Sequence, residues 1–292
     1  MTPRDWLSAL LVVVLWGLNF VAVKLALTQL PPFLLTALRF AGVALILAPL
    51  FRPRLEQLKG ILGIAVVLGI GHFGLLFFGL SGMEAATTAI VIQLGVPFSA
   101  LLAWAVFGEE LGRARAFGLV LAFAGVALLA GEPTLPHPLP LITVAVAMFC
   151  WALSNVQVKR LGNIDPMALN GWMALFAAPL LLLLSMATEH HQIEAIAASG
   201  LRVWGGFAYT VLASSVVAYT LWYRLLARHS LNRVVPITLL GPVVGVAGGV
   251  TMLGETLTWQ KLVGGAITIA GVAAVQFAGR KPPPGAEAEP GA

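Results

Sequence analysis

Long apolar stretches alternate with short charged or proline-rich breaks along almost the whole chain. A helix of about 20 apolar residues is long enough to cross a hydrocarbon core of roughly 30 Å. A window of that length predicts ten transmembrane helices, at residues 6–27, 33–51, 60–80, 86–107, 112–131, 139–160, 166–187, 204–226, 232–253 and 258–278. The predicted fold class is therefore an all-α polytopic membrane protein.

The third stretch contains "LGIGHFG", in which Gly69, Gly71 and Gly74 have the spacing of a dinucleotide-binding loop. Such a loop must follow a strand and open a helix, so that its amides face a pyrophosphate. Here no strand pattern precedes the glycines, and no acidic residue follows at the ribose-binding offset. We interpret them as packing residues of a membrane helix, in which His72 is the one ionisable residue between Ile61 and Leu80.

The composition excludes an ordinary soluble domain, because 59% of the 292 residues are hydrophobic, 10% are charged and the mean hydropathy is +0.94. A pI of about 9.8 raises nucleic acid as a partner. However, the basic residues lie in the breaks between stretches, so we expect no nucleic-acid partner and a lipid bilayer instead. Thirteen of the 17 Lys and Arg residues fall on the side where the chain begins: Arg4, Arg52, Arg54, Lys59, Arg113, Arg115, Lys159, Arg160, Arg224, Arg228, Arg233, Arg280 and Lys281. The positive-inside rule then predicts two cytoplasmic termini in the cytoplasmic (inner) membrane.

The sequence repeats internally. "WGLNFVAVK" (Trp16 to Lys24) matches "WALSNVQVK" (Trp151 to Lys159) at both ends and at several positions between them. Further along, "GEEL" at 108–111 returns as "GETL" at 254–257, and the same offset relates two glycines and two "AGVA" segments: Gly118 with Gly264, and 124–127 with 270–273. This order of matches predicts two related halves.

Each half contains five predicted helices. The predicted organisation is a first repeat at 1–131, a Pro-rich linker at 132–138, a second repeat at 139–278 and a disordered cytoplasmic tail at 279–292. Because five is odd, the second half must enter the membrane from the opposite face, so the repeats are inverted. Inverted repeats are typical of alternating-access transporters, whose substrate site lies between the halves near the membrane midplane.

The motifs resemble the EamA-type branch of the drug/metabolite transporter superfamily. The resemblance rests on "LWGLNF", on the "LRF" of Leu38 to Phe40, and on "GE.L" followed by "AGVA" in both halves. It implies a carrier with ten helices in two inverted repeats around a central cavity, and the export of amino acids or related metabolites. Among such carriers the sequence is most similar to exporters of aromatic amino acids.

Polar and aromatic side chains inside the apolar stretches are the candidate binding residues, because polar groups in hydrocarbon are costly unless they pair or face water. We expect His72 to face the cavity and to donate from one ring nitrogen to a substrate carboxylate. The alternative is that such side chains only hydrogen-bond neighbouring helices, at about 0.6 kcal/mol per bond. The residues predicted to bind the small-molecule substrate are Trp16, Asn19, His72, Gln93, Trp104, Trp151, Asn155, Trp172, Ser215 and Tyr219.

Strong charges are almost absent from the centres of the predicted helices. We expect Lys24 and Arg39 to reach toward the membrane interface along their flexible stems. A cavity without Arg or Lys favours a neutral or zwitterionic amino acid over a phosphorylated compound. Glu109 and Glu255, which end the fourth and ninth stretches on opposite faces, are expected to cap helices or to form ion pairs.

Two prolines, Pro97 and Pro242, fall at corresponding places in the two halves and are predicted hinges, because proline removes a helical hydrogen bond. No cofactor or metal is expected, since "HHQIE" (His190 to Glu194) lies in a loop and lacks two histidines four residues apart on a helix. The rival classes are a carrier of another small metabolite or drug-like compound, a membrane-embedded enzyme and a receptor. Catalysis needs a nucleophile with a base, and His72 has no such local partner.

Overall fold

The computed structural model describes residues 1–229 and 234–278, and these residues form helices and no strands. The α-helices are α1 (Pro3–Ala26), α2 (Pro32–Leu47), α3 (Leu58–Ile64), α4 (Leu75–Ser81), α5 (Ala85–Val91), α6 (Gly95–Phe107), α7 (Arg113–Leu129), α8 (Leu139–Leu161), α9 (Pro166–Thr188), α10 (Gln192–Ala198), α11 (Leu201–Ala208), α12 (Ala218–Arg228), α14 (Gly241–Leu253) and α15 (Trp259–Ala278). The predicted tail at 279–292, with Arg280 and Lys281, lies outside the described residues, as does Arg233.

Seven helical segments of the described chain are long and apolar enough to cross a membrane: Pro3–Ala26, Leu55–Ser81, Ala85–Phe107, Leu139–Leu161, Pro166–Thr188, Leu201–Trp222 and Trp259–Phe277. Two shorter apolar helices lie at Pro32–Leu47 and Ile237–Leu253. Helix α7, with 17 residues, occupies the place of the fifth predicted stretch. One helix was not expected: α10 begins inside the loop predicted around His190 to Glu194.

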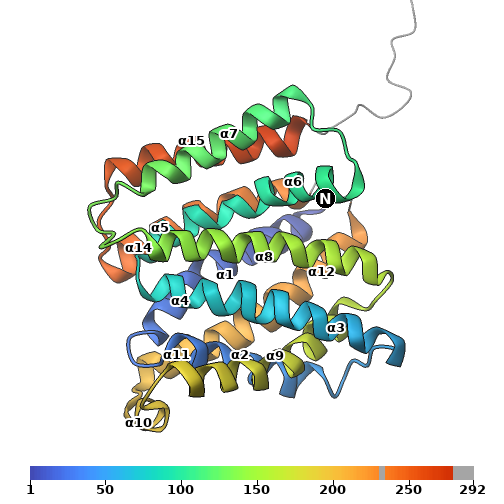
Figure 1. The fold of residues 1–292 in the computed structure, drawn as a ribbon, viewed down its shortest axis with the longest axis vertical. Helices are drawn as coiled ribbons and strands as arrows, with labels where there is room; N and C mark the ends of the chain where they lie inside the picture. The colour runs from blue at the N-terminus through green and yellow to red at the C-terminus, as the bar shows by residue number, and fades with distance from the viewer. Residues whose placement is uncertain (230–233, 279–292) are drawn as a thin grey trace, which may run out of the picture.

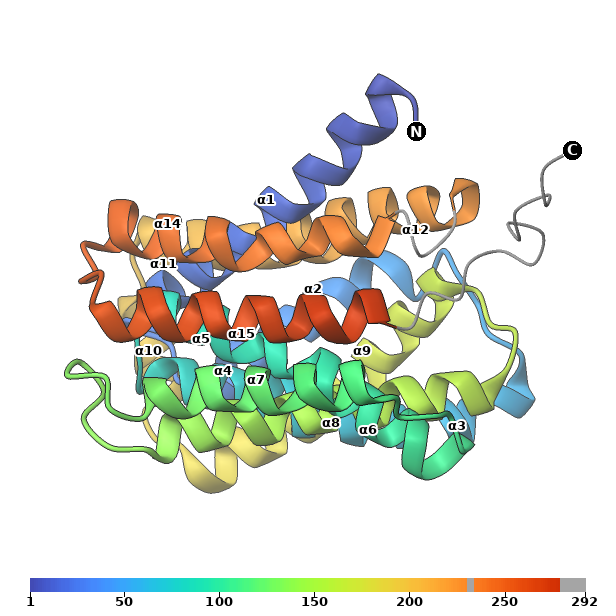
Figure 2. The ribbon, with the colours of Figure 1, turned by 90° about the horizontal axis from the view of Figure 1, so that it is seen from above.

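Corresponding helices of the two halves have corresponding neighbours. Helix α2 packs on α9, and α7 packs on α15; these pairs form opposite edges of the molecule in Figure 1. Helix α1 packs on α14, and its counterpart α8 packs on α6. The start of α1 and the end of α15 lie on the same side of the bundle, at the right in Figure 2. Helices that correspond in the sequence repeat therefore pack against corresponding partners.

The glycines of the repeat allow α7 and α15 to touch backbone to backbone. A Cβ atom added at Gly118 would lie 2.7 Å from the carbonyl oxygen of Gly271, and one at Gly264 would lie 2.8 Å from that of Gly125. Any side chain at these positions would therefore force the helices apart. Small residues serve this purpose in membrane helices, where close approach rather than hydrophobic burial drives association.

Irregular turns occur at equivalent places in both halves. The third and eighth spans each contain a π-helical segment, η2 (Ala65–Gly74) and η4 (Tyr209–Val217). The fourth and ninth spans each contain a 3₁₀ segment, η3 (Ile92–Leu94) and η5 (Val235–Leu240). A further 3₁₀ turn, η1 (Leu55–Gln57), begins the third span.

The two predicted hinge prolines follow these 3₁₀ turns. Pro97 is the third residue of α6, and Pro242 is the second residue of α14. Proline has no N–H to donate, and its ring clashes with the carbonyl four residues earlier, which disfavours regular α-helix just before it. The role of both prolines as moving hinges stays a prediction.

Candidate functional site

A buried arginine lies at the centre of the candidate site. Arg39, in the middle of α2, is 3% exposed, and its Nε and Nη2 atoms donate to the Ser215 hydroxyl oxygen at 3.2 and 3.0 Å. Ser215 in turn donates to the Thr210 carbonyl oxygen at 2.7 Å, within the π-helical segment η4. The expectation that Arg39 reaches the interface is wrong, because these hydrogen bonds hold its guanidinium between α2 and the eighth span.

Aromatic rings surround the Arg39 guanidinium. Its Cζ atom lies 4.7 Å from the centre of the Phe73 ring and 5.4 Å from that of Phe77, distances at which a cation is attracted to a ring face. Among the described residues, no carboxylate forms an ion pair with Arg39, and its Nη1 atom has no hydrogen-bond partner. The site therefore holds a positive charge with donor capacity left over.

Trp16 and Tyr219 lie against the same part of the eighth span. The Trp16 indole donates to the Ser214 carbonyl oxygen at 3.2 Å, and its ring meets the Tyr219 ring edge-on at 5.2 Å between centres. Arg39 is close enough to interact electrostatically with Tyr219. Asn19, three residues after Trp16 on α1, has a buried side-chain oxygen without a hydrogen-bond partner in the described chain. The structure thus brings together Trp16, Ser215 and Tyr219, three of the predicted residues.

His72 joins this group through Phe73. It lies in the π-helical segment η2, is 5% exposed, and its ring centre is 4.5 Å from that of Phe73. Its Nδ1 atom is 3.0 Å from the Ala147 carbonyl oxygen on α8. Because a carbonyl only accepts, Nδ1 carries the proton, and Nε2 of the neutral ring is an acceptor. In its neutral form His72 can therefore accept from an ammonium group at Nε2. The predicted hydrogen bond from His72 to a substrate carboxylate stays a prediction.

A second group of predicted residues lies where α8 meets the fourth span. Trp151 follows Ala147 by one turn of α8, and its ring packs where Gly95 has no side chain, 2.9 Å from an added Cβ atom. Gln93 lies two residues before Gly95, in the 3₁₀ segment η3. His72, which contacts Ala147, links this group to Arg39 and Ser215.

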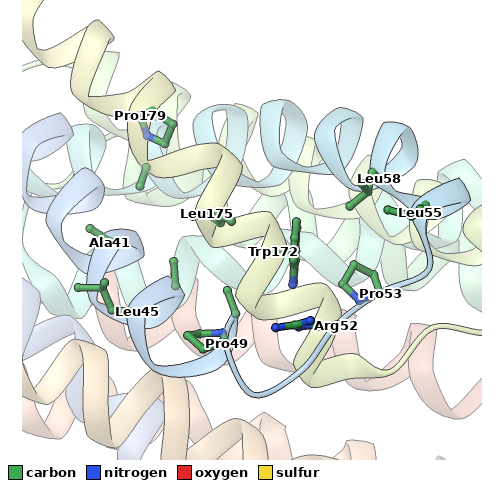
Figure 3. A pocket seen from close by; sticks show the side chains of 13 residues that line it. Ala41, Leu45, Pro49, Arg52, Pro53, Leu55, Leu58, Trp172, Leu175 and Pro179 are labelled. Carbon is green, nitrogen blue, oxygen red and sulfur yellow. The ribbon is translucent and has the colours of Figure 1, made fainter.

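Three predicted residues lie apart from these contacts. Trp104, on α6, is 54% exposed, and Asn155, on α8, is also exposed. Trp172, on α9, is partly buried, and its indole donates to the Phe51 carbonyl oxygen at 2.9 Å. It lines an open, mostly apolar pocket of about 810 Å³ between α2, α9 and the segment around Arg52 (Figure 3). The structure therefore does not bring Trp172 to the Arg39 group.

Acidic and basic side chains tie the helices together at the end of the bundle where α5 begins. Glu255 accepts from the Ala85 and Ala86 amides at 2.6 and 2.8 Å, so it caps α5 as expected for this acid. Lys261, whose side chain is fully buried, pairs with Glu84 and, at 3.5 Å, with Glu132.

Lys24 reaches the same end and donates to the carbonyl oxygens of Leu80 at 2.9 Å and Met83 at 2.6 Å. Its predicted place near an interface is thus consistent with its position at the last turn of α1. The opposite end is packed more loosely. Glu109, the counterpart of Glu255, pairs with Lys159 at 3.8 Å, and both side chains are exposed. All seven residues of α5 are buried, whereas Gly95 and Pro97 are the buried residues of α6.

Comparison with known proteins identifies the class. The chain belongs to the EamA-like transporter family, whose model matches residues 6–131 and 139–277. It is therefore a membrane transporter and not an enzyme. The family model matches the chain twice, which indicates two related halves.

Two bacterial relatives are similar over nearly their whole length. The chain is 34% identical, over 93% of its length and 94% of the relative's, to a probable amino-acid metabolite efflux pump of Salmonella typhimurium. It is 32% identical, with the same coverage, to a probable amino-acid metabolite efflux pump of Escherichia coli. The chain is also similar to a protein in a solved crystal structure, with a TM-score of 0.64 and 19% sequence identity. The match covers 95% of this chain and 98% of the other chain, so the two proteins share a fold.

Proposed function

We propose that this transporter exports small neutral or zwitterionic amino acids, with aromatic amino acids as the favoured cargo. The observation that carries the proposal is the group formed by Trp16, Arg39, His72, Ser215 and Tyr219. It gathers a cation, hydrogen-bonding atoms and flat aromatic surfaces from four different spans. The names of the two bacterial relatives support the same substrate class.

The chemistry of this group suits a zwitterion with a flat side chain. Neutral His72 offers an acceptor at Nε2, which matches an ammonium group. The indole of Trp16 and the phenol ring of Tyr219 offer apolar surfaces to an aromatic side chain. Gln93, Trp151 and Asn19 complete the proposed site from the fourth, sixth and first spans.

We further propose that ten helices cross the membrane as two inverted repeats around this site. The equivalent neighbours of α1 and α8, and the equivalent irregular turns in each half, support the repeat. The position of both described chain ends on one side of the bundle supports an even number of crossings (Figure 2). The distribution of Lys and Arg supports a cytoplasmic location for that side.

In this topology the end closed by Glu255 and Lys261 is extracytoplasmic, and the loosely packed end of α6 is cytoplasmic. The described conformation is then one in which the outer end is closed. Alternating access requires that these contacts break and that equivalent contacts form at the cytoplasmic end. Pro97 and Pro242, next to 3₁₀ turns, are the proposed points of bending.

The test is counterflow in proteoliposomes that contain the purified chain and a high internal concentration of one unlabelled amino acid. External tracer is L-phenylalanine, L-tryptophan, L-leucine or L-threonine, each with its own internal counterpart; protein-free liposomes are the control. We expect transient accumulation of the aromatic tracers above equilibrium. Accumulation of a phosphorylated tracer such as glucose 6-phosphate, without any amino acid, would instead favour a carrier of another metabolite.

A further inference from the structure

Arg39 carries a charge for which the described chain supplies no counter-ion. We propose that Arg39 binds the carboxylate of the transported amino acid, and that it makes the carrier select carboxylates over the corresponding amides. This inference rests on the proposed function and names the residue that decides its specificity. Arg39 is 3% exposed, and the hydrogen bonds of its guanidinium go to a neutral hydroxyl, that of Ser215.

The burial of an unpaired cation within a membrane protein calls for a functional explanation. Moving a charge out of water is costly, and charged side chains inside spans mark substrate or ion pathways. Lys261, whose side chain is also buried, forms ion pairs with two carboxylates, those of Glu84 and Glu132. Arg39 has no such partner among the described residues, so a carboxylate brought by the substrate is the missing half of the pair.

The hydrogen bonds of Arg39 orient the guanidinium and leave part of it available. Ser215 accepts from Nε and Nη2, and its own proton is committed to the Thr210 carbonyl oxygen, which fixes the hydroxyl. The Nη1 atom has no hydrogen-bond partner among residues 1–229 and 234–278. A planar guanidinium with free donors is the side-chain group best matched to a carboxylate.

The surroundings favour one anion of single charge. Phe73 and Phe77 flank the guanidinium of Arg39, which is 3% exposed, and such a buried, apolar environment strengthens electrostatic attraction to a carboxylate. The nearby titratable groups that face Arg39 are His72, from the third span, and Tyr219, from the eighth span. Neither adds a permanent positive charge, so the site does not match a doubly charged phosphate. The same neighbourhood offers His72 Nε2 for the ammonium group, which completes recognition of a zwitterion.

The competing explanation is that Arg39 only ties α2 to the eighth span through Ser215. A purely structural role predicts that replacement weakens the transport of every substrate alike. A carboxylate-binding role predicts a change in selectivity between substrates that differ at the carboxyl group alone. L-Phenylalanine and L-phenylalaninamide form such a pair.

The experiment measures how strongly each compound inhibits counterflow of labelled L-phenylalanine by the wild type and by Arg39→Lys. For Arg39→Gln, the binding of the same two compounds is measured in detergent by the shift that each causes in thermal stability. This measurement does not depend on transport. Arg54→Gln is the matched control, because Arg54 is an exposed arginine outside the site. Ser215→Ala, which keeps the charge but frees the guanidinium, is the second variant should Arg39→Gln not fold.

We expect the wild type and Arg54→Gln to prefer the acid by about 10-fold or more, as the loss of a charge-assisted hydrogen-bonded pair implies. Arg39→Gln should lose this preference, and Arg39→Lys and Ser215→Ala should each retain only part of it. An undiminished preference in Arg39→Gln, or in Ser215→Ala if Arg39→Gln does not fold, would overturn the inference while leaving amino-acid transport intact. Absence of counterflow with every amino acid tested on the wild type would overturn the proposed function as well.

Discussion

Replacement of Glu255 by Gln should open the end of the transporter at which α5 begins, which is extracytoplasmic in the proposed topology. The Glu255 carboxylate lies in the connection between α14 and α15 and accepts from two amides at the start of α5. Gly249 gives it room, because an added Cβ atom there would collide with the carboxylate. The contact joins the second half of the chain to the first, so it exists only while these segments lie together.

The size of the effect follows from these two hydrogen bonds. A hydrogen bond to a charged group contributes about 1.5–3 kcal/mol, and an anion at a helix N-terminus adds about 0.3–1 kcal/mol. Gln keeps one acceptor oxygen but is neutral and turns an amide group toward a second donor. The expected loss is therefore about 2–3 kcal/mol, which corresponds to a shift of about 30- to 150-fold in the equilibrium between closed and open forms.

Accessibility of a cysteine at position 83 measures this shift. Met83 is 4% exposed and lies two residues before α5, so a thiol there is protected while the end is closed. The single native cysteine, Cys150, is first replaced by Ser. The labelling rate of Met83→Cys with a membrane-impermeant maleimide should rise at least about 30-fold in Glu255→Gln.

The matched control is Glu56→Gln, since Glu56 is an exposed acid in the segment that begins the third span. It should leave the labelling rate unchanged. If Glu255→Gln lowers thermal stability but leaves the labelling rate at the wild-type value, Glu255 stabilises the fold alone and its gating role is refuted.

Three further predictions concern packing, hinges and the outer pocket. Gly271→Leu should separate α7 from α15 and lower the free energy of unfolding by about 1–3 kcal/mol or more, measured by denaturation in detergent, whereas Gly112→Ala, which meets no neighbour, should be neutral. Pro97→Ala and Pro242→Ala should each slow counterflow with little change in substrate affinity; exchange at wild-type rates in both would remove the hinge hypothesis. Trp172→Phe should cost about 1 kcal/mol of stability through loss of its bond to Phe51 but leave the substrate affinity unchanged; a weaker affinity would place Trp172 in the binding site after all.

The repeat could be predicted from the sequence because short local motifs recur in both halves. The glycines of "GEEL" and "GETL" are Gly108 and Gly254, which end α6 and α14 with φ angles of 67° and 69°, a conformation that favours glycine. The glycines of "AGVA" are those that let α7 and α15 touch. Each of these roles requires glycine at one position. The glycines therefore occur at matching positions in the two halves.

Arg39 shows where sequence reasoning failed. The sequence places Arg39 within the second predicted stretch. It does not show whether the long side chain extends toward the membrane interface or stays buried between helices. What distinguishes them is Ser215, 176 residues away, which meets Arg39 only through tertiary packing. The proposal that Arg39 contacts the substrate departs from the expectation of a cavity without Arg or Lys, and it keeps the zwitterionic cargo.

The sequence did not predict the position of Trp172 or the π-helical segments, for a related reason. A tryptophan inside an apolar stretch does not reveal which face of its helix points outward. The widened turns at Ala65–Gly74 and Tyr209–Val217 have no residue signature comparable to that of proline or of a capping glycine. They nevertheless carry His72 and Ser215, in keeping with the frequent occurrence of π-helical turns at functional sites.

Export itself is tested most directly by release of an aromatic amino acid from living cells. Cells that express the chain, and cells with an empty vector, are preloaded with labelled L-phenylalanine and transferred to medium without it. We predict faster release from the expressing cells, and at least about 10-fold less of this added release with His72→Ala present at the same level in the membrane. Release at the same rate with and without the wild-type chain would contradict the account.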